Sequence, residues 1–437
     1  MRYVGIDWSD GFHIIYITDE TGDALAAFKI DHTPEGIESL FAKVKEQARN
    51  PAEVLFALET PNGLLASAIL EAGFSLYPIN PKAVNRYRDR YKVSGKKDDY
   101  FDAMVLANIL RTDRQNHRAL IPDLLMTREL RAYTNGYQVL VKTQVRLANQ
   151  ITSCLKSYYP VALDIFEKID QPVTLSFLAK FPTPESFSRA GKGKIECLLK
   201  KSHYPGVREK MLKIYELSKK PQFEIEEPIA RADSLLLLSL VKQLKETLAS
   251  LKEFELKIAE LLEQHPDKDV FSSLPGAGNI TAARLISNFG DNRQRYGKVS
   301  CLQADAGTCP ITIRSGKSFR VSFRHSCRKS FRSVLIQFAF SSLRESEWAK
   351  QKYDKYRQKN RQGHNHALRC LANAWLEILF PMWRDRKPYN VEKHLIGVFK
   401  EQGIFSKDVK IPALVSKPMI ALNYRGPSPQ VNTIGLT

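Results

Sequence analysis

The stretch Met1-Arg2-Tyr3-Val4-Gly5-Ile6-Asp7-Trp8 decides the fold of the first part of the chain. It is a short run of β-forming residues that reaches an acidic residue at its end. A second run covers residues 12–18, after the turn Ser9-Asp10-Gly11, and a third covers residues 24–30. The three runs predict a meander of antiparallel strands.

Helices and strands alternate after this meander. The pattern predicts a helix from Pro34 to Arg49, a buried strand Val54–Leu58 that ends at Glu59, a helix from Leu64 to Ala72 and a strand from Ser75 to Ile79. Three strands followed by alternating helices and strands predict an α/β layer, and this is the element order of an RNase H-like domain. We expect this domain to cover residues 1–120.

Two long helical patterns follow, from Leu124 to Tyr159 and from Ala232 to Glu263. The second fits an antiparallel helical hairpin, an oligomerising coiled coil, or an amphipathic core helix of a bundle. We assign residues 121–268 to these helices, with a helical insert of unassigned role at 160–231. The apolar residues at heptad spacing in the second pattern are Leu237, Val241, Leu244, Leu248, Leu251, Ile258 and Leu262.

A third, mainly α-helical domain is expected at residues 269–390. It opens with Leu274-Pro275-Gly276-Ala277-Gly278, which resembles the turn of a helix-hairpin-helix. In such a turn Gly276 and Gly278 would let backbone N–H groups approach a phosphate of nucleic acid; an ordinary Pro/Gly start of a helix is the equal alternative. Residues 391–437 are richer in Pro and polar residues and are expected to form a partly flexible extension.

Composition indicates a cytoplasmic protein with a polyanionic partner. No apolar stretch approaches the roughly 18 residues of a membrane span, the N-terminus does not resemble a secretory signal, and the six cysteines form no Cys-x-x-Cys pair. The net charge is +19, and residues 291–390 hold 21 Lys and Arg against 7 Asp and Glu. Such a concentration is typical of nucleic-acid binding, although a solvated basic face is an equal alternative.

Four carboxylates are candidates for a metal site. Asp7 and Glu59 each end a strand, and Asp99 and Asp102 stand three apart at the start of a helical run, so they share one face. Hard cations such as Mg²⁺ prefer oxygen ligands, and phosphoryl transfer uses them in clusters. Singly, each acid reads as a cap or turn residue, but their order on this strand pattern predicts one site.

The motifs around these acids resemble a known family. They are Gly5-Ile6-Asp7, Leu58-Glu59-Thr60-Pro61-Asn62-Gly63, Ile79-Asn80-Pro81 and Lys97-Asp98-Asp99-Tyr100-Phe101-Asp102-Ala103. They look like the Asp-Glu-Asp-Asp (DEDD) transposases with a RuvC-like N-terminal domain, which comprise insertion-sequence recombinases and related Piv-type DNA invertases. Asp98 replaces the usual threonine, so either Asp98 or Asp99 binds metal, and the spacing to Asp102 favours Asp99.

The same resemblance extends to the basic domain. Ala304-Asp305-Ala306-Gly307-Thr308-Cys309-Pro310 and Ile313-Arg314-Ser315-Gly316 follow the family order, and Ser315 matches its serine nucleophile. On its own, a Ser-Gly pair reads as a turn. The surrounding cations would stabilise charge on a pentavalent phosphate, and His325 is a candidate for a general base. Those cations are Arg314, Lys317, Arg320 and Arg324.

The resemblance implies a transposase that cuts and rejoins DNA with a serine nucleophile and Mg²⁺, with Mn²⁺ as an alternative. It also implies a dimer or tetramer and guidance by a noncoding bridge RNA. Competing interpretations are a RuvC-like junction endonuclease, which hydrolyses without covalent linkage, a site-specific DNA invertase, and a non-catalytic nucleic-acid-binding protein. Covalent linkage conserves bond energy for rejoining, which favours the recombinase.

Overall fold

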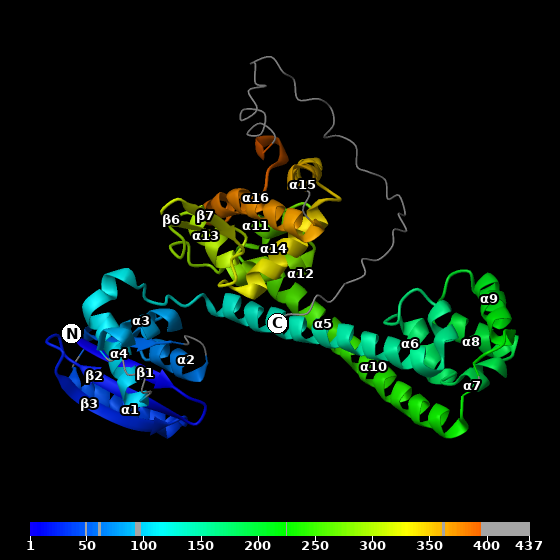
Figure 1. Cartoon of the computed structure of the whole chain (residues 1–437), viewed down its shortest axis with the longest axis horizontal. Helices are drawn as coiled ribbons and strands as arrows, with labels where there is room; N and C mark the ends of the chain where they lie inside the picture. Colours follow the sequence, from blue (N-terminus) through cyan, green and yellow to red (C-terminus); the bar gives the residue numbers. More distant parts are fainter. Residues whose placement is uncertain (49, 60–62, 92–97, 224, 361–362, 395–437) are drawn as a thin grey trace, which may run out of the picture.

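The computed structural model describes residues 1–48, 50–59, 63–91, 98–223, 225–360 and 363–394. Its N-terminal region holds a mixed five-stranded sheet in the order β3-β2-β1-β4-β5 (Figure 1). The first three strands are the antiparallel meander, and β4 and β5 add to it in parallel. The strands are β1 Arg2–Trp8, β2 Phe12–Thr18, β3 Ala24–Asp31, β4 Val54–Leu58 and β5 Ser75–Pro78.

Helices cover both faces of this sheet. On one face α1 (Pro34–Gln47) and α2 (Leu64–Glu71) pack on Val4 and Ile6 of β1. On the other face α3 (Pro81–Tyr91) and α4 (Asp99–Asp113) pack on residues that include Tyr3. Successive side chains of a strand point to opposite faces, so β1 sends Asp7 to the same face as Tyr3, the face that α4 covers.

Two long helices form a rod next to this region (Figure 1). They are α5 (Leu125–Tyr158) and α10 (Glu227–Gln264), and they contact each other along much of their length. The heptad residues of α10 except Leu248 are buried, so their partner is a helix of the same chain. The structure therefore has the antiparallel helical hairpin, one of the three alternatives that the spacing allowed.

The insert at residues 160–231 is helical and sits at the far end of the rod (Figure 1). Its core joins the C-terminal half of α5 to the N-terminal half of α10. Tyr159 and Phe187 are both fully buried in this core. The helices of the insert are α6 Pro172–Lys180, α7 Pro184–Ser188, α8 Lys192–Lys201 and α9 Val207–Lys219.

The C-terminal region is mostly helical and has its own core, centred on Trp375, Trp383 and Phe331. A two-stranded antiparallel hairpin interrupts the helices, which the sequence had not predicted; its strands are β6 (Ile311–Ser315) and β7 (Ser318–Ser322). The helices are α11 Lys268–Ser272, α12 Asn279–Phe289, α13 Val299–Ala306, α14 Lys329–Ser342, α15 Glu347–Asn360 and α16 His364–Asp385.

Some expectations fall outside the described residues. They concern Thr60, Pro61, Asn62 and Lys97 of the family motifs and most of the C-terminal extension, residues 395–437. Within the described ranges, no helix has the length and apolar character needed to cross a membrane. All six cysteines are free thiols.

Candidate functional site

Asp7 and Glu59 lie at one edge of the sheet. Ile6 of β1 pairs in parallel with Leu58 of β4. Asp7 is the next residue of β1, and Glu59 directly follows the end of β4. Parallel strands deliver their carboxyl ends to the same edge, as the sequence argument required. Asp7 is half-buried, and so is Glu59.

The three acids at the start of α4 differ in their contacts and in their exposure to solvent. Asp98 is the N-cap residue, and its side chain accepts a hydrogen bond of 3.1 Å from the backbone N–H of Tyr100. Such a bond satisfies one of the backbone donors left open at a helix start. Asp99 and Asp102 follow in the first turn; Asp99 is exposed and Asp102 is buried.

Three carboxylates meet where β1 and α4 adjoin. One oxygen each from Asp7, Asp99 and Asp102 lies within 4.8 Å of the others, whereas Glu59 lies outside this group. Three negative groups so close repel one another unless a cation lies among them. Oxygen ligands on a partly rigid frame suit a hard divalent cation, so the donor set fits such a metal.

Arg88 of α3 is a residue of this site that sequence reasoning missed. Its guanidinium forms an ion pair with the buried carboxylate of Asp102. Its Nη1 also donates to Asn85 Oδ1 over 3.2 Å. The pair depends on how α3 packs against α4, and no spacing in the sequence indicates that packing.

Ser315 lies elsewhere, on the β6–β7 hairpin, which Figure 1 shows apart from the sheet. Ser315 ends β6 and is paired with Ser318 of β7, with Gly316 and Lys317 as the turn between them. Gly316 has a φ of 55°, a left-handed conformation that favours glycine. Ser315 is exposed, so its hydroxyl is accessible to a large substrate. The structure does not bring Ser315 to the carboxylates within one chain.

The predicted cations surround this hairpin. Arg314 stacks over Phe319 across the strands at 5.2 Å, and Arg320 lies opposite Ile313. Both arginines and Lys317 are exposed, while Arg324, two residues beyond β7, is half-buried. His325 is exposed and packs edge-on against Phe323, with 4.8 Å between ring centroids. The hairpin thus presents cations and Ser315 to solvent together.

The glycine turn before α12 has a structural role. Gly276 has a φ of 76°, and a Cβ there would lie 2.8 Å from the backbone of Ser341. Its N–H, the expected phosphate donor, donates to Glu345 Oε2 over 2.7 Å. Gly278 is the N-cap of α12, with no side chain to cap it. A phosphate at Gly276 would have to displace the carboxylate of Glu345.

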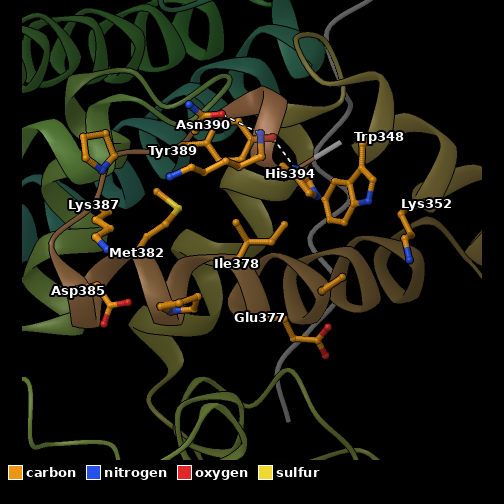
Figure 2. Close-up of a pocket in the computed structure, with 14 residues that line it drawn as sticks. Trp348, Lys352, Glu377, Ile378, Met382, Asp385, Lys387, Tyr389, Asn390 and His394 are labelled. Carbon is orange, nitrogen blue, oxygen red and sulfur yellow. Dashed lines mark hydrogen bonds between the residues drawn. The ribbon is translucent and has the colours of Figure 1, made fainter. Parts of the chain in front are cut away.

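The C-terminal region also contains a cavity of about 460 Å³ at the C-terminal end of α16. Figure 2 shows Trp348 and His394 on one side and Met382 and Lys387 on the other. Trp348 packs edge-on against the buried Trp375, with 4.9 Å between ring centroids. Trp348 therefore packs on the core of the C-terminal region.

Two parts of the chain match transposase family models. Residues 4–160 match a DEDD model of the IS110 group described as "Transposase", and residues 268–354 match one described as "Transposase IS116/IS110/IS902 family". The first match contains the four carboxylates, and the second contains Ser315.

Curated relatives agree with these matches. The mini-circle putative transposase for IS117 of Streptomyces coelicolor is 30% identical over 400 residues, 90% of this chain and 96% of that protein. The putative transposase y4uE of Sinorhizobium fredii is 31% identical over 201 residues, 46% of this chain and 56% of that protein. An uncharacterized 43.6 kDa protein of insertion element IS110 of Streptomyces coelicolor is 24% identical over 404 residues, 89% of this chain and 97% of that protein.

The IS117 relative is matched along almost its whole length, and both models match the parts of the chain that hold the candidate site residues. A transposase binds DNA, and membership of the DEDD group indicates use of a divalent metal. The chain belongs to the IS116/IS110/IS902 family of transposases.

Proposed function

We propose that this transposase cuts and rejoins DNA strands with Ser315 as nucleophile and Mg²⁺, or Mn²⁺, held by Asp7, Asp99, Asp102 and Glu59. The observation that carries the proposal is the approach of three carboxylates, from β1 and α4, to within 4.8 Å of one another. The RNase H-like interpretation of the N-terminal domain belongs to the same proposal, supported by the strand order β3-β2-β1-β4-β5.

In the chemical step, Ser315 Oγ attacks a backbone phosphorus and forms a serine–phosphate bond as the bond to one deoxyribose oxygen breaks. The hydroxyl proton leaves to solvent or a base, and the released deoxyribose oxygen takes up a proton. The reverse attack by another strand's hydroxyl restores a phosphodiester and frees the serine, with no outside energy source. The bound divalent cation would orient the phosphate and stabilise the leaving oxygen.

Ser315 and the carboxylates lie on separate parts of one chain, which favours a composite site. We propose that a dimer or tetramer supplies Ser315 from another subunit. The proposed domains are residues 1–120, 121–268 with the insert, 269–390 and 391–437; the sheet region and the insert have cores of their own, and the core of the C-terminal region also takes in Leu130, Ile258 and Leu262 of the rod. A noncoding guide RNA is part of the proposal, and the positive charge of the C-terminal region is compatible with it.

A covalent-trapping experiment tests the proposal. Wild type, Ser315→Ala, Ser318→Ala and Asp102→Asn are incubated with end-labelled DNA junctions and Mg²⁺, and adducts are counted after denaturing electrophoresis. Ser318 is the matched control, because it is exposed and directly opposite Ser315. We expect adducts with wild type and Ser318→Ala, and at least a hundredfold fewer with the other two. An adduct retained by Ser315→Ala rules out this nucleophile, and cleavage without any adduct points to a junction endonuclease.

A further inference from the structure

Three arginines gather at the base of the β6–β7 hairpin. Phe323 follows β7 directly, and the guanidinium carbons of Arg332 and Arg369 lie 4.5 and 4.6 Å from the centroid of its ring. Arg332 comes from the first turn of α14 and Arg369 from α16. Arg324 is the residue after Phe323, and its carbonyl accepts a hydrogen bond of 2.6 Å from Arg332 Nη2. We call Arg324, Arg332 and Arg369 the arginine cluster.

The charge of the arginine cluster is not balanced by acids. Among the residues that the structure describes, no member of the cluster forms an ion pair with Asp or Glu. The Nε atoms of Arg324 and Arg332 are buried and, within the described part of the chain, have no hydrogen-bond partner. Burial lowers the pKa of Arg369, and the charge of Arg332 lowers it further.

A neighbouring arginine, Arg328, has a purely structural role and serves as a comparison for the cluster. Arg328 lies four residues from both Arg324 and Arg332, and its Nε donates to Asp305 Oδ2 over 2.8 Å. Its Nη2 also donates to Tyr296 Oη over 2.5 Å. The arginine cluster has no such acid, although burial makes a partner more necessary.

Two guanidinium groups on one aromatic ring, with no acid beside them among the described residues, are suited to an anion from outside the protein. Arginine binds phosphate with two parallel N–H donors, and phosphate oxygens are its common partners in nucleic-acid complexes. One anion beside the ring of Phe323 would accept from the guanidinium groups of Arg332 and Arg369 and would relieve the repulsion between them. The phenylalanine ring holds both guanidinium groups in place before the anion arrives.

We propose that the arginine cluster binds backbone phosphates of the DNA strand that leads to Ser315. This inference rests on the proposed function, since Ser315 defines where that strand lies. Ser315 is four residues along β6 from Ile311, whose partner Ser322 immediately precedes Phe323. That length of β-strand is roughly 13 Å, which equals the rise along the helix axis of about four nucleotides of B-form DNA. The cluster would therefore hold the strand a few nucleotides from the point of attack.

The test measures DNA binding without chemistry, in the Ser315→Ala background. Arg332→Gln and Arg369→Gln are titrated with labelled single-stranded and duplex DNA across a range of salt concentrations. We expect each to weaken binding about tenfold, and to reduce the slope of log K against log salt by ~0.9 for duplex or ~0.7 for single strands. Arg384→Gln is the matched control, because Arg384 is also on α16 but exposed and paired with Asp385; its slope should not change.

Thermal unfolding separates a binding site from a structural one. Replacing Arg369, which has a like charge beside it, should leave the melting temperature unchanged or raise it, whereas replacing a structural arginine such as Arg328 should lower it. A lower melting temperature with an unchanged salt slope overturns the proposal. The proposal is also overturned if the substitutions weaken binding only to an RNA of matched length, because the cluster would then bind RNA and not DNA.

The two variants come from different helices, so Arg369→Gln carries the test if Arg332→Gln does not fold. Because binding is read without cleavage, the result is independent of the trapping experiment. If wild type forms no covalent adduct but the arginine substitutions still weaken DNA binding, Ser315 is not the nucleophile and the phosphate-binding site still stands.

Discussion

At the scale of single residues, the two neighbouring acids at the start of α4 have different roles. Asp98 uses its side chain to cap the helix, whereas Asp99 directs an oxygen toward those of Asp7 and Asp102. The substitution of Asp98 for the usual threonine of the family motif is therefore conservative in a physical sense, because both residue types are good N-caps. This geometry favours Asp99 as the metal ligand in the proposed site.

Substitution of Asp98 should change the stability of the protein, whereas substitution of Asp99 should change its affinity for metal. Asp98→Ala removes the cap and should lower the free energy of unfolding by about 1 kcal/mol, with little change in the affinity for Mn²⁺. Asp99→Asn should weaken Mn²⁺ binding at least tenfold with unfolding little changed, because it removes one ligand charge and relieves repulsion among three carboxylates. Calorimetric titration with Mn²⁺ and urea unfolding measure the two effects. Loss of Mn²⁺ binding in Asp98→Ala alone would reverse the assignment.

At the scale of elements, one glycine sets how closely α4 approaches β1. A Cβ on Gly5 would lie 1.9 Å from the carbonyl oxygen of Ala103 and 2.5 Å from the backbone nitrogen of Ala107. The helix backbone therefore rests directly on the strand. This contact brings Asp102, one residue before Ala103, toward Asp7, two residues after Gly5. The glycine of the Gly5-Ile6-Asp7 motif is thus explained by packing between two elements.

Gly5→Ala should consequently push α4 away from β1. We expect a loss of about 1–3 kcal/mol or more in the free energy of unfolding, since backbone atoms cannot move aside as a side chain can. The variant should also bind Mn²⁺ more weakly, because the carboxylates of the strand and the helix separate. Gly11→Ala is the control: it lies in the next turn, and its added Cβ meets nothing within 4 Å. Equal stability of both variants in urea would show that the close approach is not needed.

At the scale of the whole molecule, a buried acid joins the start of the rod to the C-terminal region. Asp123 precedes α5, and its carboxylate pairs with Arg131 of α5 and Arg295 beyond α12. It also accepts a hydrogen bond of 3.1 Å from the backbone N–H of Asp291. Burial alone would raise the pKa of Asp123, but the hydrogen bonds and charges of the two arginines outweigh it and lower the pKa to about 2.

This pKa predicts how stability changes with pH. A carboxyl whose pKa falls on folding stabilises the folded state above its unfolded value, 3.8, and this contribution is lost as pH falls toward about 2. The shift corresponds to on the order of 2 kcal/mol. Asp123→Asn should therefore reduce the urea midpoint at pH 7, and the difference from wild type should shrink below pH 4. Asp385→Asn, at an exposed pair, should change the midpoint little. A difference that does not depend on pH would contradict the assignment.

Much of the fold could be predicted from local patterns. The runs of β-forming residues at 2–8 and 12–18 and the heptad in α10 are patterns within one element, so they appear in the sequence. The same holds for the carboxylates at strand ends, because the edge they share follows from parallel pairing. Ser315 was assigned through the resemblance to a family, whereas the four acids were first predicted from their order on the strand pattern; the matches confirm that family.

Tertiary structure alone decided the rest. Whether the heptad of α10 pairs with α5 or with a second chain depends on the path of the insert, which brings the chain back along α5. Arg88 meets Asp102, and Arg369 meets Arg332, only because separate helices pack together. Periodicity and spacing describe contacts within an element, whereas side chains far apart in the sequence meet through packing. The sequence by itself therefore determined the elements, the carboxylates and the family, and the packing of helices decided which charges face one another.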